Sequence, residues 1–146
     1  MNLIDLISSS DVVIGLRAPD VVSAAAELLE QTLPQHGFEP DEVRRLVAKV
    51  IAREQEIPTI CGTTALPHAR DAAINLFVAA LAINHDGIVE GQREPRVIIA
   101  FLSPESKRSE HLEMLASLSR LSRDTAAIDA IAEAQTPQDV IALLQR

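Results

Sequence analysis

The sequence has no tryptophan, no tyrosine and only three phenylalanines among its 146 residues. Sites that stack sugars or nucleobases on aromatic side chains therefore have almost nothing to be built from. Positive charge is also scarce, because 13 lysines and arginines stand against 21 aspartates and glutamates, for a net charge of −8. Nucleic-acid binding requires a basic patch, so this charge argues against a nucleic-acid partner and favours basic protein partners.

Cysteine is nearly absent, and no apolar run is long. A single residue, Cys61, cannot form an internal disulfide, which favours a reducing cytoplasm. The N-terminal MNLIDLISSS has no basic region before its apolar residues, so no secretory signal is expected. The longest apolar run, residues 72–83, contains Asn75 and is shorter than the about 20 residues that cross a bilayer. We therefore expect a cytoplasmic protein without membrane insertion.

Aliphatic residues supply the core instead. Apolar residues make up 47% of the chain, enough to bury the core of one domain over residues 1–146. Their spacing predicts helices first, then strands, then helices again. The expected strands cover 11–16, 72–85 and 96–102, with an extended segment at 59–68; the expected helices cover 19–35, 40–55, 110–124 and 125–135, and a last one begins at Pro137. This order indicates an α+β or mixed α/β sandwich around one sheet of four or five strands.

Two of the four histidines fall in predicted turns, where His36 and His85 are expected to be solvated. His68 differs, because it follows Pro67, whose ring fixes φ near about −65° and stiffens the backbone. Stiff placement suits a nucleophile or a ligand. A hydrogen-bonded histidine at a strand end, without chemistry of its own, fits the same residues equally well.

His111 is a second histidine whose position suits a functional role. We expect it in the first turn of a helix capped by Ser109, where free N–H groups and the helix dipole attract an anion and lower the imidazole pKa. Lys107 and Arg108 add positive charge there, although an ordinary capped loop has the same composition. With His68, this segment indicates phosphate chemistry, in which a neutral imidazole nitrogen attacks phosphorus. Because no P-loop or glycine-rich nucleotide motif is present, the phosphoryl group is expected to come from another protein.

Several motifs resemble those of one family. The segment ALPHA at residues 65–69, preceded by Arg53-Glu54 and by a Thr-x-x-Gly, resembles the phosphorylation site of enzyme IIA domains of the bacterial phosphotransferase system, fructose/mannitol class. That class includes the nitrogen-regulatory enzyme IIA proteins. HLEMLASLSRLSRD and AEAQTPQDVIALL resemble the family's second-histidine helix and closing segment, so the resemblance covers nearly the whole chain. It implies a three-layer fold with a mixed central sheet between helices.

The resemblance also implies roles for individual residues. His68 would accept the phosphoryl group, His111 would bind it as the second active-site histidine, and Arg53 would lie near the site. The donor would be an HPr-like phosphocarrier protein, and the acceptor a IIB domain or a regulated protein, with no metal or nucleotide cofactor. The loop Gly62-Thr63-Thr64 is one residue shorter than the family's usual pattern and lacks its second glycine.

Three functions follow as hypotheses. The first is a phosphoryl carrier and phosphotransferase component. The nitrogen-regulatory type is favoured, because no sugar-specific signature and no fused IIB or IIC domain is recognisable, and a sugar-transport IIA is the other possibility. The second is an enzyme IIA-like module that is not phosphorylated and regulates partners by contact alone. The third is a metal or thiol site of His68, His111 and Cys61. No metal-ligand spacing supports that site, and Cys61 is expected to be a small packed residue.

Overall fold

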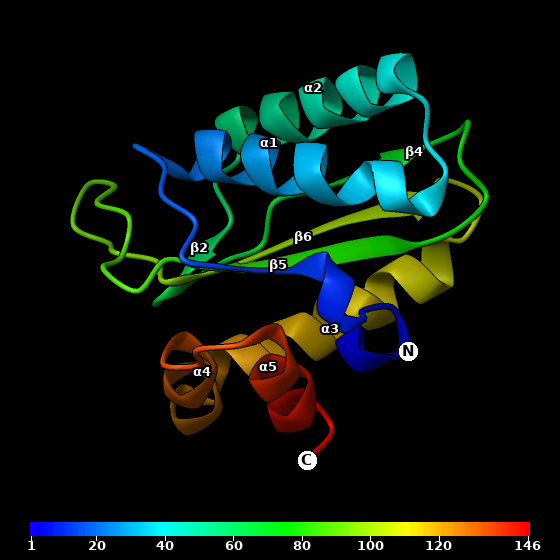
Figure 1. Cartoon of the computed structure of the whole chain (residues 1–146). Helices are drawn as coiled ribbons and strands as arrows, with labels where there is room; N and C mark the ends of the chain where they lie inside the picture. The colour runs from blue at the N-terminus through cyan, green and yellow to red at the C-terminus, as the bar shows by residue number, and fades with distance from the viewer.

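The computed structural model describes residues 1–146, in which a mixed sheet lies between two helical layers (Figure 1). The strands follow the order β1-β5-β6-β3-β2, and β4 also pairs with β6. Their bounds are β1 (Val12–Ile14), β2 (Ile60–Cys61), β3 (Thr64–Ala65), β4 (His68–Asp71), β5 (Val78–Ile83) and β6 (Val97–Pro104). The helices are α1 (Val21–Thr32), α2 (Pro40–Glu56), α3 (Arg108–Arg123), α4 (Thr125–Ala132) and α5 (Pro137–Leu144), with short 3-10 turns at Leu3–Asp5, Ser9–Asp11 and Leu33–His36.

The centre of the sheet consists of β5 and β6, which pair antiparallel and are buried along their whole length. Successive side chains of a strand point to opposite faces. Leu81 and Ile99 therefore pack on one face of the sheet, and Ala80 and Ile98 pack on the other. Because both faces are covered, the strands read as continuous apolar runs instead of an alternation.

A single position in the sheet is shared by β3 and β4. Both pair in parallel with β6, and they are separated by Leu66 and Pro67. Proline has no N–H to donate to a ladder, so the strand is interrupted there. The sheet is thus five positions wide, within the predicted four or five, although it contains six strands. Because β4 pairs only with β6, its outer edge carries no strand.

Each face of the sheet is covered by its own group of helices (Figure 1). On one face, α1 and α2 bury Leu28 and Leu46; on the other, α3, α4, α5 and the N-terminal segment bury Met114 and Ile131. Two helix starts agree with their sequence signals. Pro40 opens α2, and the Thr136 hydroxyl accepts an N–H bond at the start of α5. None of the helices has the length and apolarity that a membrane span requires.

Two of the element boundaries that differ from the predictions are set by carboxylates. The strand expected over 72–85 begins only at Val78, because the chain turns after Asp71, whose carboxylate accepts the N–H of Ala73. The first helix begins after Asp20 and not at Pro19, since the Asp20 carboxylate caps it by accepting the N–H of Ser23 at 2.7 Å. In both cases a carboxylate sets the boundary locally, whereas the apolar pattern extends beyond it.

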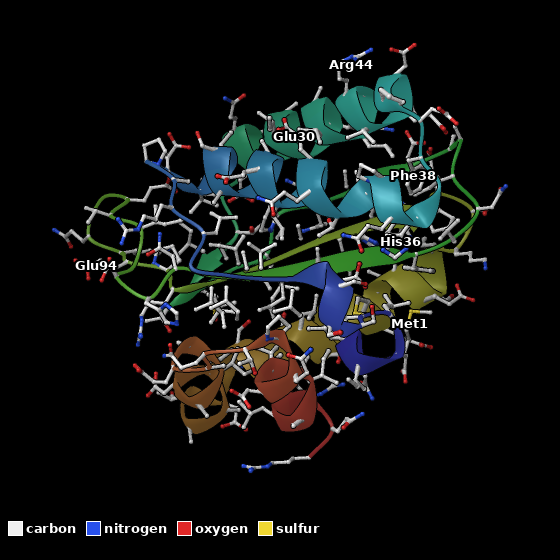
Figure 2. The ribbon with its side chains drawn as sticks, viewed as in Figure 1. Met1, Glu30, His36, Phe38, Arg44 and Glu94 are labelled. Atoms are coloured by element: carbon white, nitrogen blue, oxygen red, sulfur yellow. The ribbon has the colours of Figure 1, made fainter.

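The expectation that His36 and His85 are solvated is wrong, because both rings are partly buried and hydrogen-bonded. Nε2 of His36 lies 2.7 Å from Oδ1 of the buried Asp11, so the end of α1 is joined to the N-terminal segment (Figure 2). Nε2 of His85 lies 3.0 Å from the carbonyl oxygen of Ala134. Both histidines lie in turns, but each binds a segment remote in sequence.

A buried carboxylate joins α2 to β4. Oδ1 of Asp71 accepts hydrogen bonds from Arg45 at 2.5 Å and from Lys49 at 2.9 Å, both on α2. The hydrogen bond from Arg45, followed by that from Lys49, lowers the pKa of Asp71 to about 2, against the opposing effect of burial. This contact holds the middle of α2 beside the strand that carries His68.

We expect Asp71→Asn to lower the free energy of unfolding by about 1–2 kcal/mol at pH 7, because it weakens charge-assisted bonds whose cations are half exposed. The folded pKa of Asp71 lies below the value of about 4 in an unfolded chain. Its contribution is therefore present above about pH 4 and is lost as the pH falls toward 2. Denaturant unfolding between pH 7 and pH 2 should show a smaller acid-dependent loss in the variant than in wild type.

The matched control is Asp41→Asn, which breaks an exposed pair with Arg44 on the outer side of α2 (Figure 2). Such exposed pairs contribute little, so its unfolding curve should follow that of wild type. Identical pH dependence in wild type and Asp71→Asn would contradict the role of the Asp71 carboxylate.

Candidate functional site

A cavity of about 430 Å³ lies between α2, β4 and α3. Its lining residues are Lys49 and Arg53 from α2, His68, Ala69 and Arg70 from β4, and Arg108, His111, Leu112 and Leu115 from α3. The three predicted site residues, Arg53, His68 and His111, therefore surround one space. Cys61 is not among the lining residues; it is exposed in the β2–β3 hairpin, so the expectation that it is packed is wrong.

The imidazole of His68 is fixed in both position and tautomer. Its Nδ1 lies 2.7 Å from the carbonyl oxygen of Leu66, and because a carbonyl only accepts, Nδ1 carries the proton and donates it. The ring also stacks on Phe101, with centroids 4.8 Å apart and planes 7° from parallel. In the neutral ring the lone pair is consequently on Nε2, the nitrogen left without a partner within the protein.

His111 occupies a different helical position from the one predicted. The helix α3 begins at Arg108 with Lys107 as its N-cap, and no side chain caps it, so the expectation that Ser109 does so is wrong. The backbone N–H of His111 already donates to the carbonyl oxygen of Lys107. The His111 ring is 5% exposed, its centroid lies 5.7 Å from that of His68, and its Nδ1 lies 2.5 Å from Oγ of Ser103.

Both imidazoles are neutral at pH 7. Burial is the main cause that lowers the pKa of His68; the Leu66 hydrogen bond opposes it, and the charge of Arg53 lowers the pKa further. Burial, then the neighbouring His68 and Arg70, lower the pKa of His111 to about 4. Burial and nearby charge thus account for the neutral state of His111. The expected cause, a position among the free N–H groups of the first helical turn, does not apply. A neutral imidazole is the form that can act as nucleophile or hydrogen-bond partner.

The charge around the cavity is entirely positive. Lys49, Arg53, Arg70 and Arg108 line it and no acidic side chain does, in a chain whose net charge is −8. Nη1 of Arg53 and Nε of Arg70 are buried and have no hydrogen-bond partner. Buried donors are normally paired, and an unpaired one destabilises the protein. Four cations, two of which have an unpaired N–H donor, form an arrangement that suits an oxyanion with several acceptor oxygens.

Lys49, Arg70 and Ser103 are site residues that the sequence analysis missed. Arg70 follows His68 by two residues on one strand, so the two side chains share a face of the sheet. That alternation is a signal from which Arg70 was predictable. Ser103 lies opposite Arg70 in the pairing of β4 with β6. This pairing depends on sheet order, which the sequence does not reveal.

The loop Gly62-Thr63-Thr64 lies outside the cavity lining. Gly62 and Thr63 form the turn between β2 and β3, and Gly62 has φ of +60°, a left-handed conformation that favours glycine. The carbonyl oxygen of Thr63 accepts the N–H groups of Arg96 and Val97, so the hairpin is tied to β6. The Gly62-Thr63-Thr64 segment thus lies in the hairpin, and Arg53 lines the cavity with His68.

The protein has an α/β fold with a central mixed sheet between two helical layers. Its cavity is lined by cations and two neutral histidines, a combination that suits an oxyanion. Residues 5–146 match the family model described as phosphoenolpyruvate-dependent sugar phosphotransferase system, EIIA 2, and the chain belongs to this family. A comparison with curated protein sequences finds no match. The family assignment agrees with the resemblance seen in the sequence.

Solved structures of this family share the fold. The nitrogen regulatory protein IIA-Ntr from Neisseria meningitidis superposes with a TM-score of 0.83 at 19% identity, covering 97% of this chain and 98% of that one. IIA mannitol from Escherichia coli gives 0.77 at 23% identity, covering 94% and 98%. A complex of enzyme IIA mannitol with phosphorylated enzyme IIB mannitol from Escherichia coli gives 0.78 at 19%, covering 95% and 96%. The three-layer architecture with a mixed sheet is thereby confirmed.

The effect of the Arg70 charge on the pKa of His111 can be measured directly. The pKa of His111 lies at about 4 partly because Arg70 is close. We therefore expect Arg70→Gln to raise this pKa toward the ordinary value of about 6.5. Because the folded pKa is the lower one, neutral His111 is favoured by the fold, and its contribution to stability is lost as the pH falls from about 6.5 through 4. Proton NMR titration of the His111 ring measures the change.

Arg120→Gln is the matched control, since Arg120 is an exposed arginine of the same helix outside the cavity lining. The midpoint for His111 should be the same in this variant as in wild type. If the titration midpoint of His111 is unchanged in Arg70→Gln, the charge of Arg70 does not act on His111, which would contradict the described geometry.

Proposed function

We propose that this protein is a phosphoryl carrier in which Nε2 of His68 takes a phosphoryl group from the phosphohistidine of an HPr-like protein. The observation that carries the proposal is the tautomer of His68. Its Nδ1–H is bonded to the carbonyl oxygen of Leu66, so the unpartnered Nε2 has its lone pair in a cavity lined by cations. Membership of the EIIA family supports the same reaction.

The transfer needs no proton movement at His68. The Nε2 lone pair forms the new bond to phosphorus, the bond from phosphorus to the donor's histidine nitrogen breaks, and that nitrogen keeps the electron pair. The phosphorylated ring of His68 becomes positively charged. Its Nδ1–H then forms a stronger, charge-assisted bond to the carbonyl oxygen of Leu66.

The phosphoryl oxygens find donors already in place. Nη1 of Arg53 and Nε of Arg70 are buried without partners, and His111 lines the same cavity. Donors that are positioned before the reaction stabilise the charge of the transition state most effectively. The positive charges of Lys49 and Arg108 add to this stabilisation, as metal ions do in nucleotide-dependent phosphoryl transfer.

The approach of a donor protein is favoured by the rim of the cavity. Leu112 lines the cavity and is 52% exposed, which offers a partner an apolar contact beside the reacting histidine. Cations surround this contact, so a donor with acidic or neutral groups around its own phosphohistidine fits best. Such a docked partner would exclude water from His68 during transfer.

We further propose that the phosphorylation state serves as a regulatory signal, as in the nitrogen-regulatory type, and that relay to a IIB domain is the second candidate. The lack of a recognisable sugar-specific signature supports regulation. The similar structure of IIA mannitol with phosphorylated IIB mannitol favours a IIB-type partner as the alternative. In both cases His68 is the phosphorylated residue.

We expect the wild-type protein to be labelled on incubation with enzyme I, HPr and radiolabelled phosphoenolpyruvate, and His68→Ala to remain unlabelled. His111→Ala should be labelled about 100-fold more slowly, since loss of one preorganised donor costs about 3 kcal/mol of transition-state stabilisation. Rapid-quench labelling measures both effects. His85→Ala removes a histidine outside the cavity and should be labelled at the wild-type rate.

Each outcome of this experiment has a distinct meaning. An unlabelled wild type contradicts the carrier function and leaves the module that acts by contact alone. Label that persists in His68→Ala contradicts the assignment of the acceptor. A folded His111→Ala that is labelled at the wild-type rate excludes His111 from the reaction.

The regulatory use predicts that the phosphorylated protein keeps its phosphoryl group when mixed with a purified sugar-specific IIB domain. Loss of label from this protein and its appearance on the IIB domain, followed by gel electrophoresis, would establish the relay instead. Enzyme IIA mannitol with its own IIB domain serves as the positive control for transfer. Labelled protein that also fails to return its phosphoryl group to HPr would contradict reversible carriage.

A further inference from the structure

Strand β6 contacts both histidines of the cavity through two side chains on one face. Phe101 and Ser103 are two residues apart, so both point toward the α3 layer. Phe101 stacks on the ring of His68, and Oγ of Ser103 lies 2.5 Å from Nδ1 of His111. The strand thereby fixes the plane of one imidazole and binds one nitrogen of the other.

The hydroxyl group of Ser103 has only one place for its proton. Ser103 is fully buried, and Nδ1 of His111 is the single hydrogen-bond partner of its Oγ. If Nδ1 carried a proton, it would donate to Oγ and leave the hydroxyl proton without an acceptor. A buried donor without an acceptor is strongly disfavoured. The hydroxyl therefore donates to Nδ1.

We propose that Ser103 fixes His111 in the tautomer with its proton on Nε2, which makes His111 a hydrogen-bond donor to the phosphoryl group. The tautomer follows from the contact with Ser103 alone, whereas the donor role rests on the proposed phosphoryl transfer. The opposite tautomer would turn a lone pair toward the phosphoryl oxygens and repel them. Ser103 is thus a positioning residue that acts through His111.

The two histidines then have complementary tautomers. The Leu66 carbonyl accepts from Nδ1 of His68 and leaves a lone pair on its Nε2, while the Ser103 hydroxyl donates to Nδ1 of His111 and leaves a proton on its Nε2. One ring supplies a nucleophile and the other a donor, although both are neutral. The two rings differ because the partner of Nδ1 is a hydrogen-bond acceptor in His68 and a hydrogen-bond donor in His111.

Nitrogen-15 NMR of the histidine side chains in the unphosphorylated protein at pH 7 tests the tautomer directly. We expect His111 to show an unprotonated Nδ1 and a protonated Nε2, and His68 to show the reverse, as an internal reference. Ser103→Ala should shift His111 toward a mixture of both tautomers. A proton on Nδ1 of His111 in wild type overturns the proposal, whether or not the variant folds.

Phosphorylation rates test the consequence. We expect Ser103→Ala to be phosphorylated about tenfold more slowly, in line with the loss of other hydrogen bonds that orient a functional histidine. Ser103→Thr, which keeps the hydroxyl, should recover most of the rate. In the His111→Ala background, Ser103→Ala should not reduce the phosphorylation rate further. If Ser103→Ala reduces the rate equally in wild type and in His111→Ala, Ser103 does not act through His111 and the proposal is overturned.

The matched control is Ser122→Ala, which removes the hydroxyl of a serine on α3 whose Oγ donates to the carbonyl oxygen of Leu118. It should change neither the tautomer of His111 nor the phosphorylation rate. A wild type that shows the expected tautomer but accepts no phosphoryl group would contradict the proposed function and leave the assignment of the tautomer intact.

Discussion

The hydrogen bond from Nδ1 of His68 to the carbonyl oxygen of Leu66 is the contact on which the proposed chemistry of the cavity depends. It spans only two residues, and the residue between them is Pro67, which interrupts the sheet ladder. The break that divides β3 from β4 therefore coincides with the bond that selects the tautomer of His68. Neutral imidazoles exchange tautomers freely in water, and this bond keeps the lone pair of the neutral His68 ring on Nε2.

The rest of the fold supplies rigid supports for this bond. Strand β6 is buried along its whole length and places Phe101 and Ser103 against the two imidazoles. Asp71, at the other end of β4, binds Lys49 and holds α2 close to the strand. Side chains carried by buried strands are positioned more accurately than side chains on loops. The cavity is consequently assembled from three elements whose own positions are fixed by the core.

Local sequence signals predicted much of the fold and part of the site. The apolar spacing indicated the layered architecture, and the Pro-His pair with a second histidine motif indicated the two rings that line the cavity. Contacts between remote segments were not predictable in this way. His36 and His85 bind segments remote in sequence, and Ser103 reaches His111 only through the order of the sheet. The prediction of a Ser109 cap was wrong because helix α3 begins two residues earlier, at Arg108.

The unpaired nitrogens of Arg53 and Arg70 have a thermodynamic consequence. While the cavity holds no anion, the folded protein bears the unfavourable free energy of two buried donors without acceptors. Under the proposed function, a phosphoryl group on His68 would bring acceptor oxygens into the cavity that both arginines line, and the unfolded chain would gain nothing comparable. The covalent state of one imidazole would thus be linked to the stability of the whole domain, through the same linkage by which bound ligands stabilise proteins.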